Sequence, residues 1–180
     1  SSWQNPTSAV SLVDYPPLYS LQAKENKEAQ YRVWTDLIIA YTKSKKMWSI
    51  SLQAFPLFSR PQINRDAPME LRKEIIEYMK DHGRALWIGS SQRLQAYILR
   101  DSVNTWVDTI VNSLREKAMT NPVQSHELVE DVDYTGDAFY GMPDDLMEML
   151  LQQAVKSGKM VSFKTGDDVS YKLVSADRKS

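Results

Sequence analysis

The sequence predicts a mainly α-helical fold with small β-hairpins, in which one structural module occurs twice. Two observations predict the duplication. A helix–glycine–strand layout at residues 68–88 returns at residues 143–163, with a constant offset of 75 positions. A second pair of similar stretches, WTDLI at 34–38 and WVDTI at 106–110, is offset by 72 positions. The 180 residues therefore suit two domains of about 80 residues each.

The two copies of the longer repeat carry helix start and stop signals at matching positions. Pro68 and Pro143 open the two helices, where the missing N–H of a proline costs nothing. Gly83 and Gly158 stand where a residue in the left-handed conformation would end each helix. The matching apolar positions are Leu71 and Leu146, Ile75 and Leu150, Ile76 and Leu151, Leu86 and Val161, and Ile88 and Phe163. We therefore expect one scaffold in two versions.

The first half begins with a long helix at residues 25–46, where Tyr31, Trp34, Ile38 and Tyr41 form one apolar face at helical spacing. The other elements expected in this half are a short strand at 47–52, a short helix near 56–58, a helix at 68–82, and a hairpin with strands at 84–88 and 94–99. The sequence thus predicts the order helix, strand, short helix, helix, strand, strand.

The second half repeats that order. Its expected elements are a helix at 103–118, a short strand at 122–124, a short helix at 125–130, an acidic loop at 131–141, a helix at 143–157, and strands at 159–164 and 169–174. A helix-turn-helix followed by a β-hairpin is the pattern of a winged helix. We therefore predict two tandem winged-helix domains, with a boundary near residues 100–102 and no flexible linker.

The full division of the chain follows from these elements. We expect a disordered lead-in at 1–13, a docking arm at 14–24, a first winged-helix domain at 25–101, a second at 102–175, and a disordered tail at 176–180.

The arm carries the sequence Tyr-Pro-Pro-Leu-Tyr at residues 15–19. Two prolines favour an extended backbone, and a short extended apolar segment loses little entropy when it docks into a groove of a partner. Packing of the arm on its own domain is the alternative from the residues alone. A third interpretation is that PPLY is a ligand for a WW domain, which binds extended proline-rich segments.

Composition argues against several function classes. The chain has no cysteine, so it offers neither disulfides nor thiolate metal ligands. No apolar run approaches about 18 residues, and the N-terminal residues do not have the pattern of a secretory signal. The two histidines, His82 and His126, fall in different halves and outside any metal or triad spacing. We expect no enzyme, no metal and no cofactor.

Charge argues against the most obvious function of a winged helix. Residues 1–100 hold 14 Lys and Arg against 9 Asp and Glu, whereas residues 101–180 hold 8 against 14. Phosphate contacts from Lys and Arg supply most of the affinity for DNA, yet the helices at 68–82 and 143–157 are net acidic. We therefore expect no nucleic-acid binding, and tandem winged helices that bind nucleic acid remain the alternative function.

The chain resembles the family of the small, twice-present subunit of ESCRT-II, vacuolar protein sorting subunit twenty-five. The resemblance spans about residues 14–174. It is carried by YPPLYSLQ at 15–22, the helix with Trp34, PLF at 56–58, the helix–glycine–strand at 68–88, Trp106, HEL at 126–128 and FYGM at 139–142.

The resemblance implies a non-enzymatic adaptor of endosomal multivesicular-body sorting that is cytoplasmic and reaches the endosomal membrane only through its complex. It implies docking of the arm on the two larger ESCRT-II subunits, through Pro16, Pro17 and Tyr19 with support from Leu18. It also implies that the second winged helix recruits the ESCRT-III subunit that starts filament assembly. Because that domain is acidic, we nominate the following residues for a basic helix: Glu130, Asp131, Asp133, Asp144 and Asp145.

Overall fold

The computed structural model describes residues 12–89 and 92–174. The chain divides into two compact units, and the division falls between Arg100 and Asp101. We call them unit 1 and unit 2 and describe each by itself. The lead-in expected at 1–13 lies outside the described residues up to residue 11, and so does the tail expected at 176–180.

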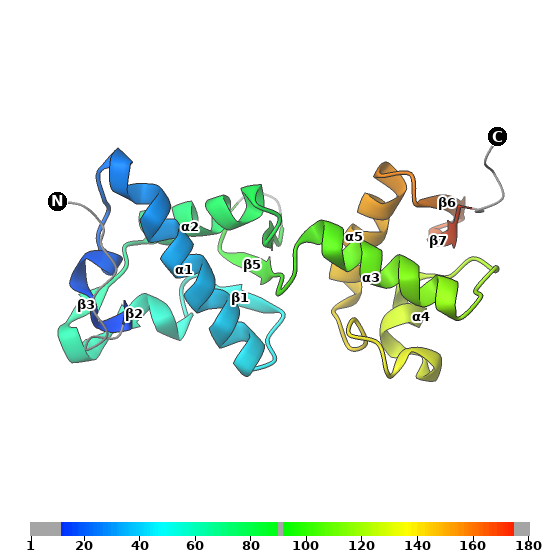
Figure 1. Ribbon diagram of the computed structural model, residues 1–180, viewed down its shortest axis with the longest axis horizontal. Helices are drawn as coiled ribbons and strands as arrows, with labels where there is room; N and C mark the ends of the chain where they lie inside the picture. The colour runs from blue at the N-terminus through cyan, green and yellow to red at the C-terminus, as the bar shows by residue number, and fades with distance from the viewer. Residues whose placement is uncertain (1–11, 90–91, 175–180) are drawn as a thin grey trace. The chain divides into compact units, whose positions relative to one another are not determined.

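Unit 1 combines two α-helices with a small sheet and several 3₁₀ turns (Figure 1). Its elements are η1 Leu12–Asp14, η2 Pro16–Tyr19, α1 Lys24–Ser44, β1 Ser49–Ser51, η3 Pro56–Phe58, β2 Ser59–Arg60, η4 Pro61–Ile63, β3 Arg65–Asp66, α2 Met69–Asp81, β4 Ala85–Trp87 and β5 Gln95–Ile98. The strands β1, β5 and β4 form an antiparallel sheet in that order, so the wing of unit 1 has three strands.

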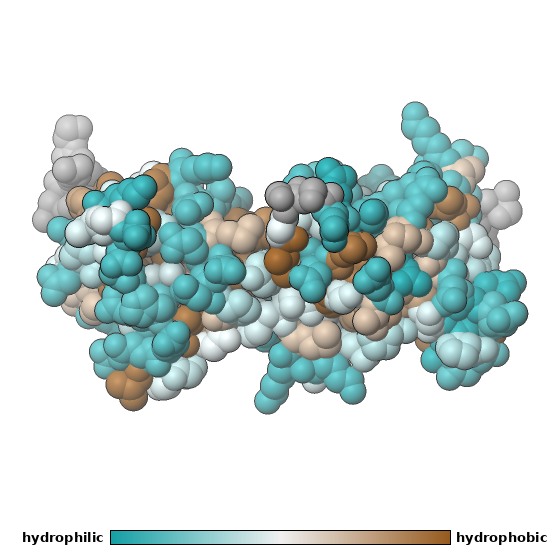
Figure 2. All heavy atoms as spheres, turned by 180° about the vertical axis from the view of Figure 1, so that it is seen from behind, coloured by the Kyte–Doolittle hydropathy of each residue, from teal (hydrophilic) through white to brown (hydrophobic). Residues whose placement is uncertain are grey.

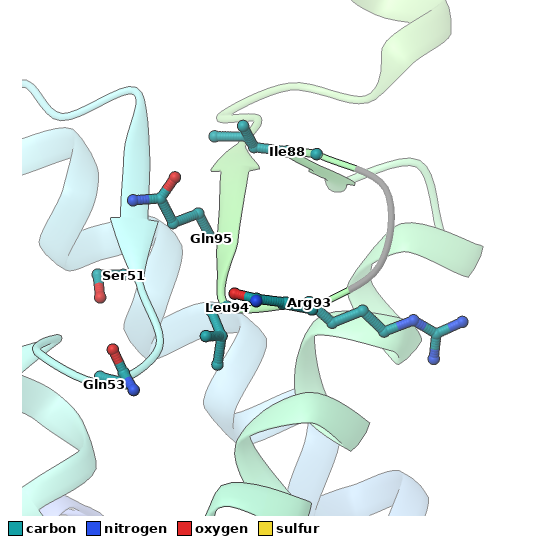
Figure 3. Close-up of a pocket in the computed structure, with 8 residues that line it drawn as sticks. Ser51, Gln53, Ile88, Arg93, Leu94 and Gln95 are labelled. Atoms are coloured by element: carbon teal, nitrogen blue, oxygen red, sulfur yellow. The ribbon is translucent and has the colours of Figure 1, made fainter.

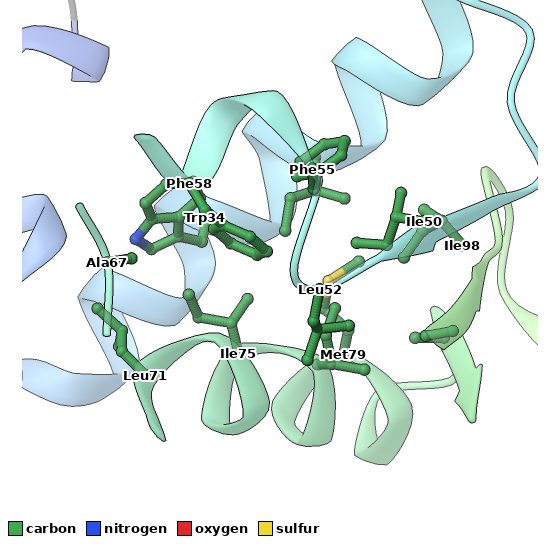
Figure 4. Packing of buried hydrophobic residues seen from close by; sticks show 14 of the residues in the cluster. Trp34, Ile50, Leu52, Phe55, Phe58, Ala67, Leu71, Ile75, Met79 and Ile98 are labelled. Carbon is green, nitrogen blue, oxygen red and sulfur yellow. The ribbon is translucent and has the colours of Figure 1, made fainter. Parts of the chain in front are cut away.

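The core of unit 1 lies between its helices and its sheet. Figure 4 shows side chains of α2 pointing toward Trp34 of α1, Phe58 of η3 and Leu52 beside the sheet. Trp34, Phe58 and Leu52 are all fully buried. Because burial of apolar surface is the main driving force of folding, this shared cluster fixes how α1 and α2 pack.

One part of unit 1 was not predicted. The short helix expected near 56–58 is the 3₁₀ helix η3, and an unpredicted small hairpin, β2–β3, follows it. Pro56 and Pro61 lack an N–H for helical hydrogen bonding, and Asn64 turns the chain with a φ of 54°. Asparagine tolerates that left-handed conformation better than most residues. The proline-rich connection is thus more ordered than its sequence indicates.

Unit 2 shows the same plan with three true helices (Figure 1). Its elements are α3 Val103–Glu116, α4 Ser125–Glu130, η5 Val132–Tyr134, α5 Asp144–Lys156, β6 Met160–Thr165 and β7 Asp168–Leu173. The strands β6 and β7 pair antiparallel over their whole length. The strand expected at 122–124 is reduced to one bridge, between Val123 and Tyr171.

Local sequence signals explain where the helices of unit 2 begin. The Ser102 side chain accepts a hydrogen bond from the backbone N–H of Thr105 at 3.1 Å and caps α3. A capping box joins Gln124 and Glu127 at the start of α4, with 2.7 Å between the Gln124 backbone N and the Glu127 carboxylate. These caps satisfy backbone groups that a helix end leaves free.

The repeat has the helix ends that the sequence predicts, with one correction. Gly83 and Gly158 adopt φ values of 73° and 80°, so each ends its helix in the left-handed conformation. Pro68 and Pro143 occupy the N-cap positions of α2 and α5, one residue before the expected first helical position. Both prolines have extended ψ angles, of 155° and 139°, that a helical residue cannot have.

Candidate partner-docking site

The PPLY motif forms a tight turn on unit 1, which we call the PPLY turn (residues 15–20). Pro16–Tyr19 is a 3₁₀ helix, and Ser20 N donates to the Pro17 carbonyl oxygen at 3.3 Å. The expected extended backbone is therefore wrong. Proline fixes φ near −65°, which suits a 3₁₀ turn as well as an extended chain, so ψ decides between them. The 3₁₀ turn places the side chains of Leu18 and Tyr19 in the core, and their burial favours it over the extended backbone.

Leu18 and Tyr19 are anchored in the core of unit 1. Leu18 is completely buried and Tyr19 is 2% exposed. The Tyr19 ring packs edge-on against Trp34, with 5.5 Å between the ring centroids. Its hydroxyl donates to the Val13 carbonyl oxygen at 2.7 Å. The motif therefore packs on the domain that follows it, which is the alternative that the sequence left open, and docking of residues 14–24 on a partner stays a prediction.

The environment of the tyrosine hydroxyl favours its neutral form. Burial raises the pKa of Tyr19, while the positive charge of Arg60 opposes the rise and the negative charge of Asp14 adds to it. Arg60 and Asp14 form an ion pair, with 2.8 Å between the Arg60 Nε and a carboxylate oxygen of Asp14. This pair joins η1 to β2, and residues 12–13, the end of the expected disordered lead-in, lie in the same 3₁₀ helix as Asp14.

Helix α1 holds the backbone of the PPLY turn through two side chains on one face. The indole Nε1 of Trp34 donates to the Leu18 carbonyl oxygen at 2.9 Å. The amide of Gln30, one helical turn earlier, donates to the carbonyl oxygens of Leu18 at 3.2 Å and Ser20 at 2.7 Å. Gln22 also donates to the Pro17 carbonyl oxygen at 2.9 Å. The turn is therefore fixed by its backbone as well as by its side chains.

The outer side of the PPLY turn is accessible and presents both apolar and polar residues. Pro16 and Ser20 are exposed, and Pro17 is half-buried. Leu21 is 44% exposed, and it is the one large hydrophobic side chain that is exposed among the described residues of unit 1. Prediction from the sequence missed Leu21 and Gln30. The signal for Gln30 is its place four residues before Trp34, in the apolar stripe of α1.

The acidic residues nominated in unit 2 fall into two groups. Glu130, Asp131 and Asp133 lie at the end of α4 and in η5, and all three are exposed. Asp144 and Asp145 lie in the first turn of α5, and the Asp144 carboxylate accepts from the Ser125 hydroxyl at 2.6 Å. Asp144 thus contacts the first residue of α4, whereas Glu130 is the last residue of that helix. The rise of a helix places these two ends about 8 Å apart, so the two acidic groups lie at opposite ends of α4.

Exposed hydrophobic side chains accompany the first acidic group. Val132 is 75% exposed between two aspartates, and Tyr140 is 37% exposed with its hydroxyl donating to the Glu130 carbonyl oxygen at 3.2 Å. The same negative charges affect the pKa of the buried Tyr134. Burial raises the pKa of Tyr134 first, and negative charges nearby, including those of Asp131 and Asp133, raise it further.

A hollow of about 420 Å³ lies beside the sheet of unit 1, where it is lined by residues of β1, β5 and the segments next to them. Most of its side chains are uncharged, and Figure 3 shows Arg93 extending away from Ser51 and Gln53. An Arg93 guanidinium nitrogen lies 3.8 Å from a carboxylate oxygen of Glu77. Among the described residues that line the hollow, no two form a pair suited to acid–base catalysis.

Each of the two histidines lies against an oxygen atom of its own segment, and among the described residues neither belongs to a cluster of metal-binding groups. His82 Nδ1 lies 2.8 Å from the Tyr78 carbonyl oxygen, at the end of α2, and His126 Nε2 lies 2.8 Å from the Gln124 side-chain oxygen. Within residues 12–89 and 92–174, no cluster of three or more metal-binding side chains occurs, and no helix is long and apolar enough to cross a membrane. Figure 2 shows mainly polar side chains on the face drawn, with hydrophobic ones in small groups.

Solved structures of ESCRT-II subunits share this fold. A crystal structure of subunit VPS25 of the endosomal trafficking complex ESCRT-II superposes with a TM-score of 0.75, at 23% identity, over 91% of this chain and 97% of that one. A structure of the endosomal complex ESCRT-II (VPS22/VPS25/VPS36) gives 0.72 at 24% identity, over 91% and 97%. The predicted fold of tandem winged helices is confirmed.

Sequence comparison agrees with the fold. Vacuolar protein sorting-associated protein 25 of Arabidopsis thaliana is 28% identical, over 89% of this chain and 92% of its own length. Its counterparts in Saccharomyces cerevisiae and Homo sapiens are 24% and 21% identical, over 91% and 87% of this chain and 97% and 93% of their own lengths. The model of the family described as "ESCRT-II complex subunit" matches residues 12–143. The predicted family is confirmed: this chain belongs to the ESCRT-II complex subunits.

Proposed function

We propose that this chain is the small, non-enzymatic adaptor subunit of an ESCRT-II complex, which it joins through the PPLY turn of unit 1. The observation that carries the proposal is the family match over residues 12–143, which spans the turn, the rest of unit 1 and about half of unit 2. Relatives of this fold have been crystallised in a complex of VPS22, VPS25 and VPS36. On this proposal the chain acts in endosomal sorting and reaches the membrane through its complex.

Mixing the chain with the two larger ESCRT-II subunits tests the proposal. We expect a stable complex that contains two copies of this chain and one of each larger subunit. Native mass spectrometry of the purified complex gives that stoichiometry directly, and a mixture lacking either larger subunit serves as the control. A chain that stays free at micromolar concentrations of both larger subunits would contradict the proposed function.

The second part of the proposed function is recruitment of the ESCRT-III initiating subunit by unit 2. The first acidic group and the exposed Val132 together offer charge and apolar surface to a basic amphipathic helix, which pairs both kinds of contact. Residues 101–180 hold 14 acidic against 8 basic side chains, so the whole unit would attract such a helix.

Reversing two charges tests this surface. We expect the double substitution of Glu130→Lys and Asp133→Lys to weaken binding of the ESCRT-III initiating subunit about tenfold or more, because like charges then face each other. Isothermal titration at two salt concentrations measures the loss and its screening. The matched control is Asp167→Lys with Asp168→Lys, which changes the same charge at the tip of the β6–β7 hairpin. An equal loss in both double variants would refute a local acidic site.

Nucleic-acid binding remains the alternative function, and the side chains of α2 do not favour it. Both guanidinium contacts of Arg72 go to backbone carbonyl oxygens, of Ala67 at 2.7 Å and of Leu52 at 2.7 Å. Lys80 lies 3.3 Å from a carboxylate oxygen of Glu77 on the same helix. With Lys73, α2 carries three basic side chains against four acidic ones, so the helix as a whole offers no positive surface to phosphate.

A further inference from the structure

We propose that one end of the sheet of unit 1 is a contact surface for an anionic phospholipid membrane. The surface, which we call the basic patch, consists of cationic residues from three segments of the chain: Lys43, Lys45, Lys46, Arg84 and Arg100. The inference goes beyond the proposed function, and its choice of a lipid surface rests on that function, because an ESCRT-II complex would bring the chain to the endosome.

The topology of the sheet brings the three segments of the basic patch together. Strand β1 runs antiparallel to β5, and β5 runs antiparallel to β4, so the start of β1, the end of β5 and the start of β4 share one end of the sheet. Figure 1 shows α1 ending in the loop that leads into β1, and the three lysines lie there. Arg84 precedes β4 and Arg100 follows β5, so both arginines stand at the same end.

Printed contacts join the two arginines to this end of the sheet. The guanidinium carbon of Arg100 lies 4.4 Å from the centroid of the Trp48 ring, two residues after Lys46. Arg84 donates to the carbonyl oxygens of Leu99, at 3.2 Å, and of Arg100. The lysine segment and the two arginines therefore meet at Trp48.

The charge of the basic patch is not neutralised by carboxylates of the described residues. Within residues 12–89 and 92–174, none of its five cations forms an ion pair, whereas Lys27, Arg60 and Lys80 of the same unit each do. The three lysines are exposed and the two arginines are half-buried. Cations that gather without counter-charges create a positive potential that attracts an anionic surface.

Lys46 stands at a backbone position that favours glycine. Helix α1 ends in a Schellman motif, in which Met47 N donates to the Thr42 carbonyl oxygen at 2.8 Å and Lys46 N donates to that of Lys43 at 3.2 Å. Lys46 has a φ of 56°, the left-handed conformation that glycine adopts at the ends of α2 and α5. Because a side chain is unfavourable in that conformation, position 46 offers a test that separates charge from stability.

An anionic membrane suits the basic patch better than a nucleic acid does. Single-stranded nucleic acids are held by aromatic rings on which bases stack, but the Trp48 ring is half-buried and Arg100 lies over one of its faces. A lipid surface requires neither a groove nor a ring, because each Lys or Arg near an anionic leaflet contributes about a fivefold factor in affinity through its charge. The patch would therefore add a direct contact once the complex has reached the membrane.

Co-sedimentation of the full chain with vesicles tests the basic patch. We expect wild type to bind vesicles of phosphatidylcholine with about one third phosphatidylserine, but not vesicles of phosphatidylcholine alone. Binding should disappear at an ionic strength of about 1 M, where the screening length falls to about 3 Å. The triple substitution Lys43→Glu, Lys45→Glu and Lys46→Glu should weaken binding about a hundredfold or more, since three fivefold factors are lost.

A matched control distinguishes a local patch from the net charge of the chain. It makes the same change of charge at three exposed lysines of unit 2: Lys156→Glu, Lys164→Glu and Lys172→Glu. We expect this control to bind vesicles nearly as wild type does. An equal loss of binding in the two triple variants would overturn the basic patch.

Replacing Lys46 alone separates its charge from the stability of unit 1. We expect Lys46→Gly to keep or raise the thermal midpoint by up to a few degrees, because glycine fits the left-handed conformation. The same variant should bind anionic vesicles about fivefold more weakly. Lys46→Arg retains the charge and should bind as wild type does. Undiminished binding by Lys46→Gly would count against the assignment.

Two further outcomes would overturn the inference without touching the proposed function. The first is a wild-type chain that does not bind anionic vesicles although it assembles with the two larger subunits. The second is a wild-type chain that binds an RNA oligonucleotide more tightly than the vesicles at the same salt concentration, because the patch would then be a nucleic-acid surface. Failure of assembly itself, measured separately by native mass spectrometry, is the result that contradicts the proposed function.

Discussion

Trp34→Ala is expected to lower the free energy of unfolding of unit 1 by about 3–5 kcal/mol, the range for deleting a large buried aromatic side chain. Trp34 is fully buried and joins three parts of the unit. Its ring lies 5.5 Å from that of Tyr19 and 5.1 Å from that of Phe58, and its N–H holds the Leu18 carbonyl oxygen. Total stabilities of about 5–15 kcal/mol are typical of small domains, so the loss is large.

Urea denaturation followed by circular dichroism measures this loss, and hydrogen exchange locates it. We expect faster exchange in the PPLY turn and in α2 together, because Trp34 packs in the cluster that both share. Trp34→Phe keeps an aromatic ring and removes the N–H, so it should cost less and affect mainly the turn. A loss below about 1 kcal/mol for Trp34→Ala would contradict the central role of this residue.

The second large effect concerns the repeated scaffold. Ile75 in α2 and Leu150 in α5 occupy matching positions and are both completely buried. Ile75→Ala and Leu150→Ala should each cost about 2–5 kcal/mol, from lost burial and from the cavity left behind. Since each residue packs inside its own unit, we expect protection from hydrogen exchange to fall in unit 1 for the first variant and in unit 2 for the second.

The exposed neighbours Glu70→Ala and Asp145→Ala provide a control pair, one in each of the same two helices. Each is an acid in the first turn of its helix, so its loss should cost only about 0.3–1 kcal/mol of helix-dipole interaction, well below a core substitution. Loss of protection throughout both units after either core substitution would show that the two repeats unfold as one body.

The repeat was predictable because local signals and the tertiary fold agree there. Helical spacing of apolar residues places Leu71, Ile75 and Met79 on one buried face, and glycines end both helices in the conformation that favours glycine. The helix at 125–130 was also predicted at its observed ends. In each case a short stretch of sequence contains the physical cause of its own structure.

The PPLY turn was not predictable in this way, because its conformation depends on residues far along the chain. Proline allows both the extended and the 3₁₀ backbone, and the choice follows from Trp34 and Gln30 on a later helix. The exposure of Leu21 could not be predicted either. It stands out only because the neighbouring Leu18 and Tyr19 are buried, which the sequence does not show. The sequence singled out the motif, but the burial of Leu18 and Tyr19 within it became visible only in the structure.

The burial of Leu18 and Tyr19 in the core of unit 1 also changes how sequence variants of this chain should be interpreted. Leu18 and Tyr19 share one buried cluster with Trp34 of α1 and Phe58 of η3, so we expect a substitution in α1 or η3 to disturb the turn even though it lies many positions from the motif. Under the proposed function, an incorrectly folded unit 1 cannot display its docking surface. Assembly of the complex would then act as a quality check, because only correctly folded copies are incorporated.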